Sequence, residues 1–148
     1  ALQQGGEALE LIRRVVGQAD IVTPTANEAY LLTGEKDPRR AAFALREMGA
    51  TIVAVTLEKQ GCWLLTPTEV AYASAYCVET VEPTGAGDAF CAALSCGVLQ
   101  GWPAARLAAY ANAAGALAVA AIGHMGQALP TVGRIEELMA GEKYPPPE

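Results

Sequence analysis

Hydrophobic and polar positions follow two periods along the chain, and these periods predict its elements. Residues Leu9, Ile12, Val15 and Val16 form one helical stripe near the start. Short apolar runs, typical of buried strands, follow between polar segments. We expect helices in ALQQGGEALELIRRVVGQ, NEAYLLTG and DPRRAAFALREMG and over Ala86–Gln100, Pro103–Ala121 and Val132–Ala140, with strands in ADIVTPT and over Ile52–Leu57, Cys62–Thr66 and Val70–Ala75.

Capping and turn residues support these boundaries. Asp37 and Pro38 suit the cap and first turn of a helix, and Gly34 and Gly49 suit helix ends. Residues 67–68 predict a hairpin turn. Apolar strands that alternate with helices predict an α/β domain with a mostly parallel sheet covered on both faces. No repeat or linker divides the chain.

Composition narrows the class of protein. The chain has 148 residues, of which 52% are hydrophobic and 18% charged, and this composition excludes an intrinsically disordered chain. A net charge of -6 with scattered basic residues argues against nucleic acid as a partner. The uncharged segment Leu107–Ile122 is rich in alanine and too short for a membrane span, so it predicts a buried helix and no membrane partner.

The cysteines indicate a reducing compartment. The chain has no signal-like start and no C-x-x-C pair, so we expect a cytoplasmic protein with reduced, mostly buried thiols. His124 is the single histidine, which argues against a zinc site. The four cysteines are Cys62, Cys77, Cys91 and Cys96. The absence of an initiator Met and of a strand before the first helix suggests a fragment or a processed piece.

A glycine-rich turn opens the helix expected at residue 86. A helix start exposes unpaired N–H groups and the positive end of the helix dipole, so Gly85, Ala86 and Gly87 can cradle an anion. Asp88 has two interpretations. It caps the helix, or it serves as a general base beside a phosphoryl group.

The surroundings of this turn resemble a known family. VEPTGAGDAFCAALSCGVLQG is similar to the C-terminal signature of the ribokinase-like (PfkB) carbohydrate kinases. Three more segments resemble the family's motifs in the family's order: ADIVTPTANEAYLLTG, TIVAVTLEKQGCWLL and YANAAGALAVAAIGHMGQALPT. The resemblance implies a three-layer α/β/α sandwich. Residues 1–148 would be its C-terminal nucleotide-binding and catalytic part, without the N-terminal half and the lid.

The resemblance also implies a reaction. Asp88 would remove the proton from a sugar hydroxyl that attacks the γ-phosphate of ATP, and the amides of Gly85, Ala86 and Gly87 would form the anion hole. Glu28 would organise Mg²⁺ around the phosphates. Thr25 stands where the family more often has asparagine.

Other implied contacts depart further from the family pattern. Thr56 and Gly61 match the nucleotide loop T-L-G-x-x-G, but Glu58 replaces its middle glycine, so an ordinary turn is the alternative. Asn112 would line the adenine site, or it is a buried structural asparagine. Positions that would surround a K⁺ ion are Glu82, Thr84, Ala118, Ala121 and Gly123.

We therefore expect an ATP-dependent kinase of a small sugar, with little turnover by the isolated chain. Ribose, fructose and 2-keto-3-deoxygluconate all stay open, and a nucleoside is disfavoured. The rival is a non-catalytic nucleotide-binding or regulatory remnant, for which Glu58 and Thr25 are signs of decay. An oxidoreductase fails because no G-x-G-x-x-G follows the first strand. A homodimer, or association through an uncovered sheet edge, is the expected partner mode.

Overall fold

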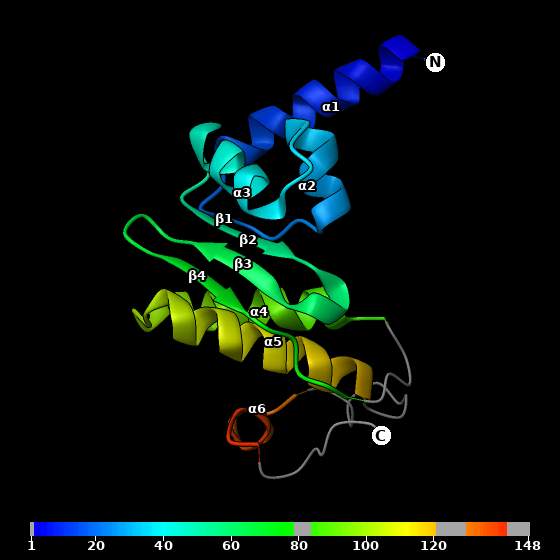
Figure 1. Cartoon of the computed structure of the whole chain (residues 1–148). Coiled ribbons are helices and arrows are strands. Elements are labelled where there is room, and N and C mark those ends of the chain that lie inside the picture. The colour runs from blue at the N-terminus through cyan, green and yellow to red at the C-terminus, as the bar shows by residue number, and fades with distance from the viewer. Residues whose placement is uncertain (1, 79–83, 121–129, 142–148) are drawn as a thin grey trace. The chain divides into compact units, whose positions relative to one another are not determined.

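The computed structural model describes residues 2–78, 84–120 and 130–141 (Figure 1). The helices are α1 (Leu2–Val16), α2 (Ala26–Thr33), α3 (Pro38–Glu47), α4 (Ala86–Leu99), α5 (Ala104–Ala120) and α6 (Val132–Met139), and η1 (Glu58–Gln60) is a short 3-10 helix. The strands are β1 (Ile21–Val22), β2 (Ile52–Thr56), β3 (Cys62–Leu65) and β4 (Val70–Ala73). Each helix and strand predicted from the pattern is present, with small differences at the ends.

The four strands form one sheet in the order β1-β2-β3-β4. β1 and β2 are parallel, with Ile21 opposite Ile52. The predicted hairpin joins β3 and β4, and the amide of Thr66 donates to the carbonyl oxygen of Glu69 at its base. Because a hairpin reverses the chain, the sheet is mixed.

Contacts divide the chain into two compact units, each described here by itself. Unit 1 comprises Ala1–Leu57 with Trp63–Ala71, and unit 2 comprises Glu58–Cys62 with Tyr72–Glu148. One boundary between the units falls just after β2, and the others fall within β3 and β4. None of them falls in a linker.

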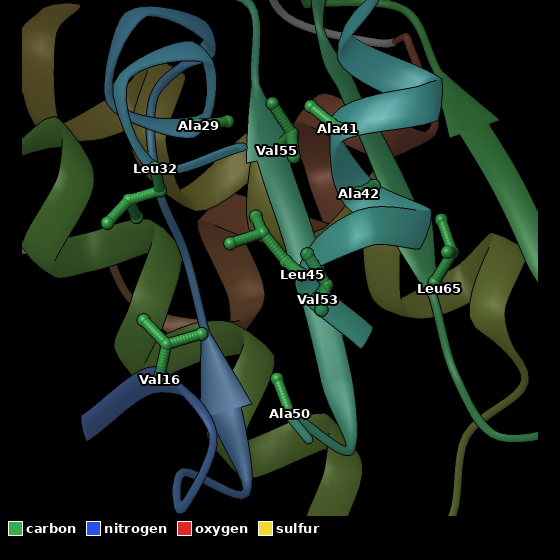
Figure 2. Packing of buried hydrophobic residues seen from close by; sticks show 10 residues of the cluster. All are labelled: Val16, Ala29, Leu32, Ala41, Ala42, Leu45, Ala50, Val53, Val55 and Leu65. Atoms are coloured by element: carbon green, nitrogen blue, oxygen red, sulfur yellow. The ribbon is translucent and has the colours of Figure 1, made fainter. Parts of the chain in front are cut away.

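Unit 1 has an apolar core between α3 and the sheet. The Asp37 carboxylate accepts hydrogen bonds from the amides of Arg39 and Arg40, so α3 begins where the cap and Pro38 predict. Figure 2 shows how side chains from helices and strands meet in this core. The buried cluster comprises Val16, Ala29, Leu32, Ala41, Ala42, Leu45, Ala50, Val53, Val55 and Leu65.

The helical stripe of α1 is only partly buried. Val16 joins the core and Leu9 packs against it, as the period predicts. Ile12 and Val15, which belong to the same stripe, are 49% and 60% exposed. The physical reason is that helical period fixes which residues share a face, whereas their burial requires another element against that face.

Unit 2 is built on the pair α4 and α5, with α6 packed against α5. Most of α5 is buried, as predicted for this alanine-rich segment. Trp102 meets Tyr110 edge to face at 4.9 Å, and the Arg106 guanidinium lies 4.0 Å from the centre of the Trp102 ring. The described helices include none that is long and apolar enough to cross a membrane.

All four cysteines are free thiols, as predicted, but they are less buried than predicted. Cys62 is buried, Cys91 is half-buried, and Cys77 and Cys96 are exposed. The expectation of mostly buried thiols is therefore wrong, because helical and loop positions leave two sulfur-bearing side chains at the surface. Burial raises the pKa of the Cys62 thiol to about 12, although hydrogen bonds with Asn112 and Ala73 oppose the change.

Candidate active site

The start of α4 carries the glycine-rich turn. Gly85 is its N-cap residue, with φ 92° in the left-handed region, and no side chain caps the helix. The Ala89 amide donates to the Gly85 carbonyl oxygen at 3.0 Å, which closes the first helical turn. The amides of Ala86, Gly87 and Asp88 precede that bond, so helix geometry gives them no acceptor within α4. Space is open where a Cβ of Gly85 or Gly87 would stand.

Asp88 lies in the first turn of α4 and is exposed. It does not cap the helix, because Gly85 occupies the cap position and receives no side-chain hydrogen bond. A carboxylate here lies next to the positive end of the helix dipole. The geometry therefore leaves a charged, accessible oxygen acceptor beside three available amides.

Close packing against α5 fixes the position of α4. A Cβ on Gly115 would stand 3.2 Å from the carbonyl oxygen of Ala86, the first residue of α4. Gly97 makes a similar approach near the other end of α4, where a Cβ would meet Leu107 at 2.6 Å and Trp102 at 2.8 Å. Gly115 and Gly97 thus permit close packing near both ends of α4.

The proposed nucleotide loop has an unusual backbone. Glu58 has φ 53° and is the one non-glycine residue with positive φ among the described residues. This conformation explains why a glycine suits the position, since glycine adopts it without steric cost. Gly61 has φ 112°, and a Cβ there would collide with the carbonyl oxygen of Ala73.

Asn112 contacts the chain rather than open space. Its side-chain amide donates to the carbonyl oxygens of Ala73 at 3.0 Å and Ser74 at 3.3 Å. These contacts fit the structural interpretation of Asn112. A role at an adenine site stays a prediction.

Thr25 and Glu28 are paired with each other in a capping box. The Thr25 amide donates to Glu28 Oε2 at 2.8 Å, and the Glu28 amide donates to Thr25 Oγ1 at 3.3 Å. Thr25 is the N-cap residue of α2, and Glu28 lies in the first turn of this helix. Asn27, in the same turn, is exposed. One Glu28 oxygen is thus engaged with the backbone.

Two of the predicted site residues are neighbours at the sheet. Thr25 and Thr56 form a parallel bridge, and the Thr56 amide donates to the Pro24 carbonyl oxygen at 3.0 Å. They lie just beyond β1 and at the last residue of β2. Carboxyl ends of parallel strands are the usual place for ligands in α/β proteins.

The positions expected around K⁺ are only partly described. Thr84 is exposed and directly precedes the turn, and Ala118 is half-buried in α5. Glu82, Ala121 and Gly123 lie outside the described residues.

Sequence motifs do not reveal every residue that supports these elements. Tyr72 of β4 donates its hydroxyl to the carbonyl oxygen of Gln60 at 2.5 Å, and no motif includes it. Gly115 offered a weak signal, since an isolated glycine inside a helix often marks close packing. Among the described residues, no group of three His, Cys, Asp or Glu could hold a metal ion.

Comparison with known proteins identifies the family. The pfkB family carbohydrate kinase profile matches residues 1–131, so the chain belongs to this family. A 2-dehydro-3-deoxygluconokinase of Bacillus subtilis (strain 168) is 35% identical over 133 residues, which cover 89% of this chain and 41% of the relative. The sequence-based assignment is confirmed.

Solved structures agree with this result. A candidate ribokinase II of E. coli in complex with ATP and Mg²⁺ has a TM-score of 0.81 and 33% identity, over 93% of this chain and 44% of its own. A Vibrio cholerae O395 fructokinase double mutant with bound fructose, ADP and potassium has a TM-score of 0.73 and 28% identity, over 90% of this chain and 45% of its own. The predicted ribokinase-like fold is confirmed, and the chain spans less than half the length of these proteins.

Proposed function

We propose that this chain is the C-terminal nucleotide-binding and catalytic part of an ATP-dependent carbohydrate kinase. The observation that carries the proposal is the start of α4. There, an accessible Asp88 carboxylate stands beside a glycine turn with no side-chain cap. The similarity to proteins solved with ATP and Mg²⁺ and with fructose and ADP supports it.

In the proposed reaction Asp88 is the general base. Its carboxylate accepts the proton of a sugar hydroxyl, the hydroxyl oxygen bonds to the γ-phosphorus of ATP, and the bond to the β–γ bridging oxygen breaks to release ADP. The amides of Gly85, Ala86 and Gly87 donate to the equatorial oxygens, where negative charge develops.

The proposed nucleotide contacts come from several elements. Thr56, Glu58 and Gly61 belong to the nucleotide loop, and Asn112 would support the adenine side. Thr25 stands at the start of α2. The residues of η1 are exposed, so a nucleotide can reach them.

The residues fit a magnesium ion that is carried largely by nucleotide. Mg²⁺ in such sites is bound by one or two carboxylates together with substrate phosphates and waters. Glu28 is the candidate, acting through water or phosphate, with the oxygen that the capping box does not use. Bound Mg²⁺ would neutralise charge on the phosphates.

A K⁺ ion beside the turn is a further part of the proposal. Thr84 and Ala118 would contribute, with Glu82, Ala121 and Gly123 from outside the described residues. Replacing K⁺ by Na⁺ at constant ionic strength should weaken ATP binding, and unchanged affinity would rule this site out.

The reaction is tested by measuring ADP release with ATP, Mg²⁺ and a panel of ribose, fructose and 2-keto-3-deoxygluconate. The assay uses residues 1–148 and, where the coding sequence continues upstream, the longer product. We expect Asp88→Asn to lower turnover about 10²- to 10⁴-fold with little change in ATP affinity. Asp20→Asn, which removes the same charge from an exposed site, should change neither. Near-normal turnover by Asp88→Asn would refute the base assignment.

A second candidate is a non-catalytic nucleotide-binding or regulatory remnant. The left-handed Glu58 and the Thr25–Glu28 capping box favour it, because both use predicted ligand positions in an ordinary structural way. This candidate predicts nucleotide binding without turnover on any sugar of the panel, even in a longer product.

A further inference from the structure

Tyr72 makes a hydrogen bond at the protein surface rather than in the buried core. It lies in β4, its side chain is 48% exposed, and its hydroxyl donates to the carbonyl oxygen of Gln60 at 2.5 Å. Gln60 is the last residue of η1 and directly precedes Gly61 in the proposed nucleotide loop. An exposed tyrosine therefore ties this loop to β4.

The residues that follow Tyr72 hold the loop at adjacent points. Gly61 packs directly against the carbonyl oxygen of Ala73, where no side chain fits. The Asn112 amide donates to the same carbonyl oxygen and to that of Ser74. We call the contacts of Tyr72 with Gln60 and of Ala73 with Gly61 the loop clasp.

The clasp acts next to the least favourable backbone conformation in the loop. Glu58 has φ 53°, which a side chain with a Cβ disfavours. A loop with glycine at this position holds that conformation without strain. With glutamate there, the loop must be held by contacts elsewhere, and Gln60 is only two residues away.

We propose that Tyr72 is a positioning residue of the nucleotide site, which compensates for Glu58 by holding residues 58–61 in the nucleotide-binding conformation. This inference rests on the proposed function. The Tyr72 hydroxyl acts on the main chain of the loop and not on the reacting atoms. Loss of the Tyr72 hydroxyl should therefore weaken nucleotide binding and leave turnover at saturating ATP unchanged. Loss of the Asp88 carboxylate should instead lower turnover and leave nucleotide affinity nearly unchanged.

The clasp itself is tested without nucleotide, by hydrogen exchange of the peptide that covers residues 57–62. Tyr72→Phe removes only the hydroxyl, and we expect faster exchange of this peptide. Tyr30→Phe removes the same atom from a tyrosine of similar exposure, 44%, and should leave the exchange unchanged. Unaltered exchange in Tyr72→Phe would overturn the proposal.

Compensation is tested by a double-mutant cycle on MgATP affinity, measured by ligand-observed NMR so that weak binding is detected. We expect Tyr72→Phe to weaken binding about fivefold, as for the loss of one ordinary hydrogen bond. In a Glu58→Gly background Tyr72→Phe should weaken MgATP binding twofold or less, because glycine removes the backbone strain at position 58. An equal loss in both backgrounds would overturn the compensation.

The outcomes separate this inference from the proposed function. If the unmodified chain binds MgATP and Tyr72→Phe binds it equally well, Tyr72 has no positioning role and the kinase proposal survives. If neither the unmodified chain nor Glu58→Gly binds MgATP, the nucleotide loop is wrong, and both proposals fall together.

Discussion

Gly115 of α5 lies against the carbonyl oxygen of Ala86, so close that a Cβ on residue 115 would stand 3.2 Å away. Asn112 lies three residues earlier on α5 and binds the end of β4. Residues three apart in a helix share a face. One turn of α5 therefore supports both the start of α4 and the strand that holds the nucleotide loop.

Enlarging Gly115 should displace the start of α4. We expect Gly115→Leu to lower the free energy of unfolding of unit 2 by about 1–3 kcal/mol, as overpacking usually does. It should also weaken any binding at the glycine turn. Unit 2 can be followed by Trp102 fluorescence in a Trp63→Phe background, because each unit holds one of the two tryptophans.

Gly133 of α6 provides the matched control for this change. A Cβ there would meet nothing within 4 Å, so Gly133→Leu should leave unit 2 as stable or make it slightly more stable. Equal destabilisation by the two substitutions would show that the close approach at Gly115 does not matter.

Replacing Glu58 by glycine should stabilise the protein. Relief of the left-handed backbone strain, less the extra entropy of glycine in the unfolded chain, is worth about 1 kcal/mol. Glu58→Asn should gain part of this, since asparagine tolerates the region, and Glu58→Ala should gain least. Urea denaturation measures the series. If Ala were to stabilise as much as Gly, charge rather than backbone strain would be the cause.

The capping box separates two roles of Glu28. Thr25→Ala should destabilise unit 1 by about 0.5–2 kcal/mol through loss of the α2 cap. Glu28→Gln should be nearly neutral for stability, because glutamine also completes a capping box. If Glu28 also serves Mg²⁺, the glutamine variant should need more Mg²⁺ for half-maximal turnover. An unchanged Mg²⁺ requirement would leave Glu28 with the structural role alone.

Stability should fall in alkaline solution because of Cys62. Its folded pKa is about 12 against an ordinary 9.0, so above pH 9 the unfolded chain loses a proton that the folded chain keeps. The free energy of unfolding then falls by up to about 1.4 kcal/mol per pH unit until pH 12. Between pH 8 and 10 we expect a loss of about 1.4 kcal/mol.

Two variants assign this slope to its source. Cys62→Ala should lack that part of the loss, whereas Cys96→Ala, at an exposed cysteine, should retain it. At neutral pH a thiol reagent should modify Cys77 and Cys96 in the folded chain much faster than Cys62. An equal alkaline loss in Cys62→Ala and in the unmodified chain would contradict the assignment.

Local rules explain how far the sequence could predict the fold. Asp37, Pro38 and Gly34 act within one helical turn, so the ends of α2 and α3 follow from a few neighbouring residues. The family was readable for the same reason, because its motifs are short and continuous.

Other features depend on residues that are distant in the chain. The period predicts a common face for Ile12 and Val15, but not whether anything covers that face. The sequence also could not show that Thr25 and Glu28 bind each other, since the same spacing suits a capping box and a metal ligand.

The sequence by itself determined the helices and strands, the glycine turn before Asp88 and the family to which the chain belongs. Only the tertiary structure decided that Tyr72 holds Gln60, that Gly115 lies against Ala86 and that Asn112 supports the end of β4. The reason is that helix caps and periods arise from contacts within a few residues. These three contacts join segments 12 to 39 residues apart, which come together only when the chain folds.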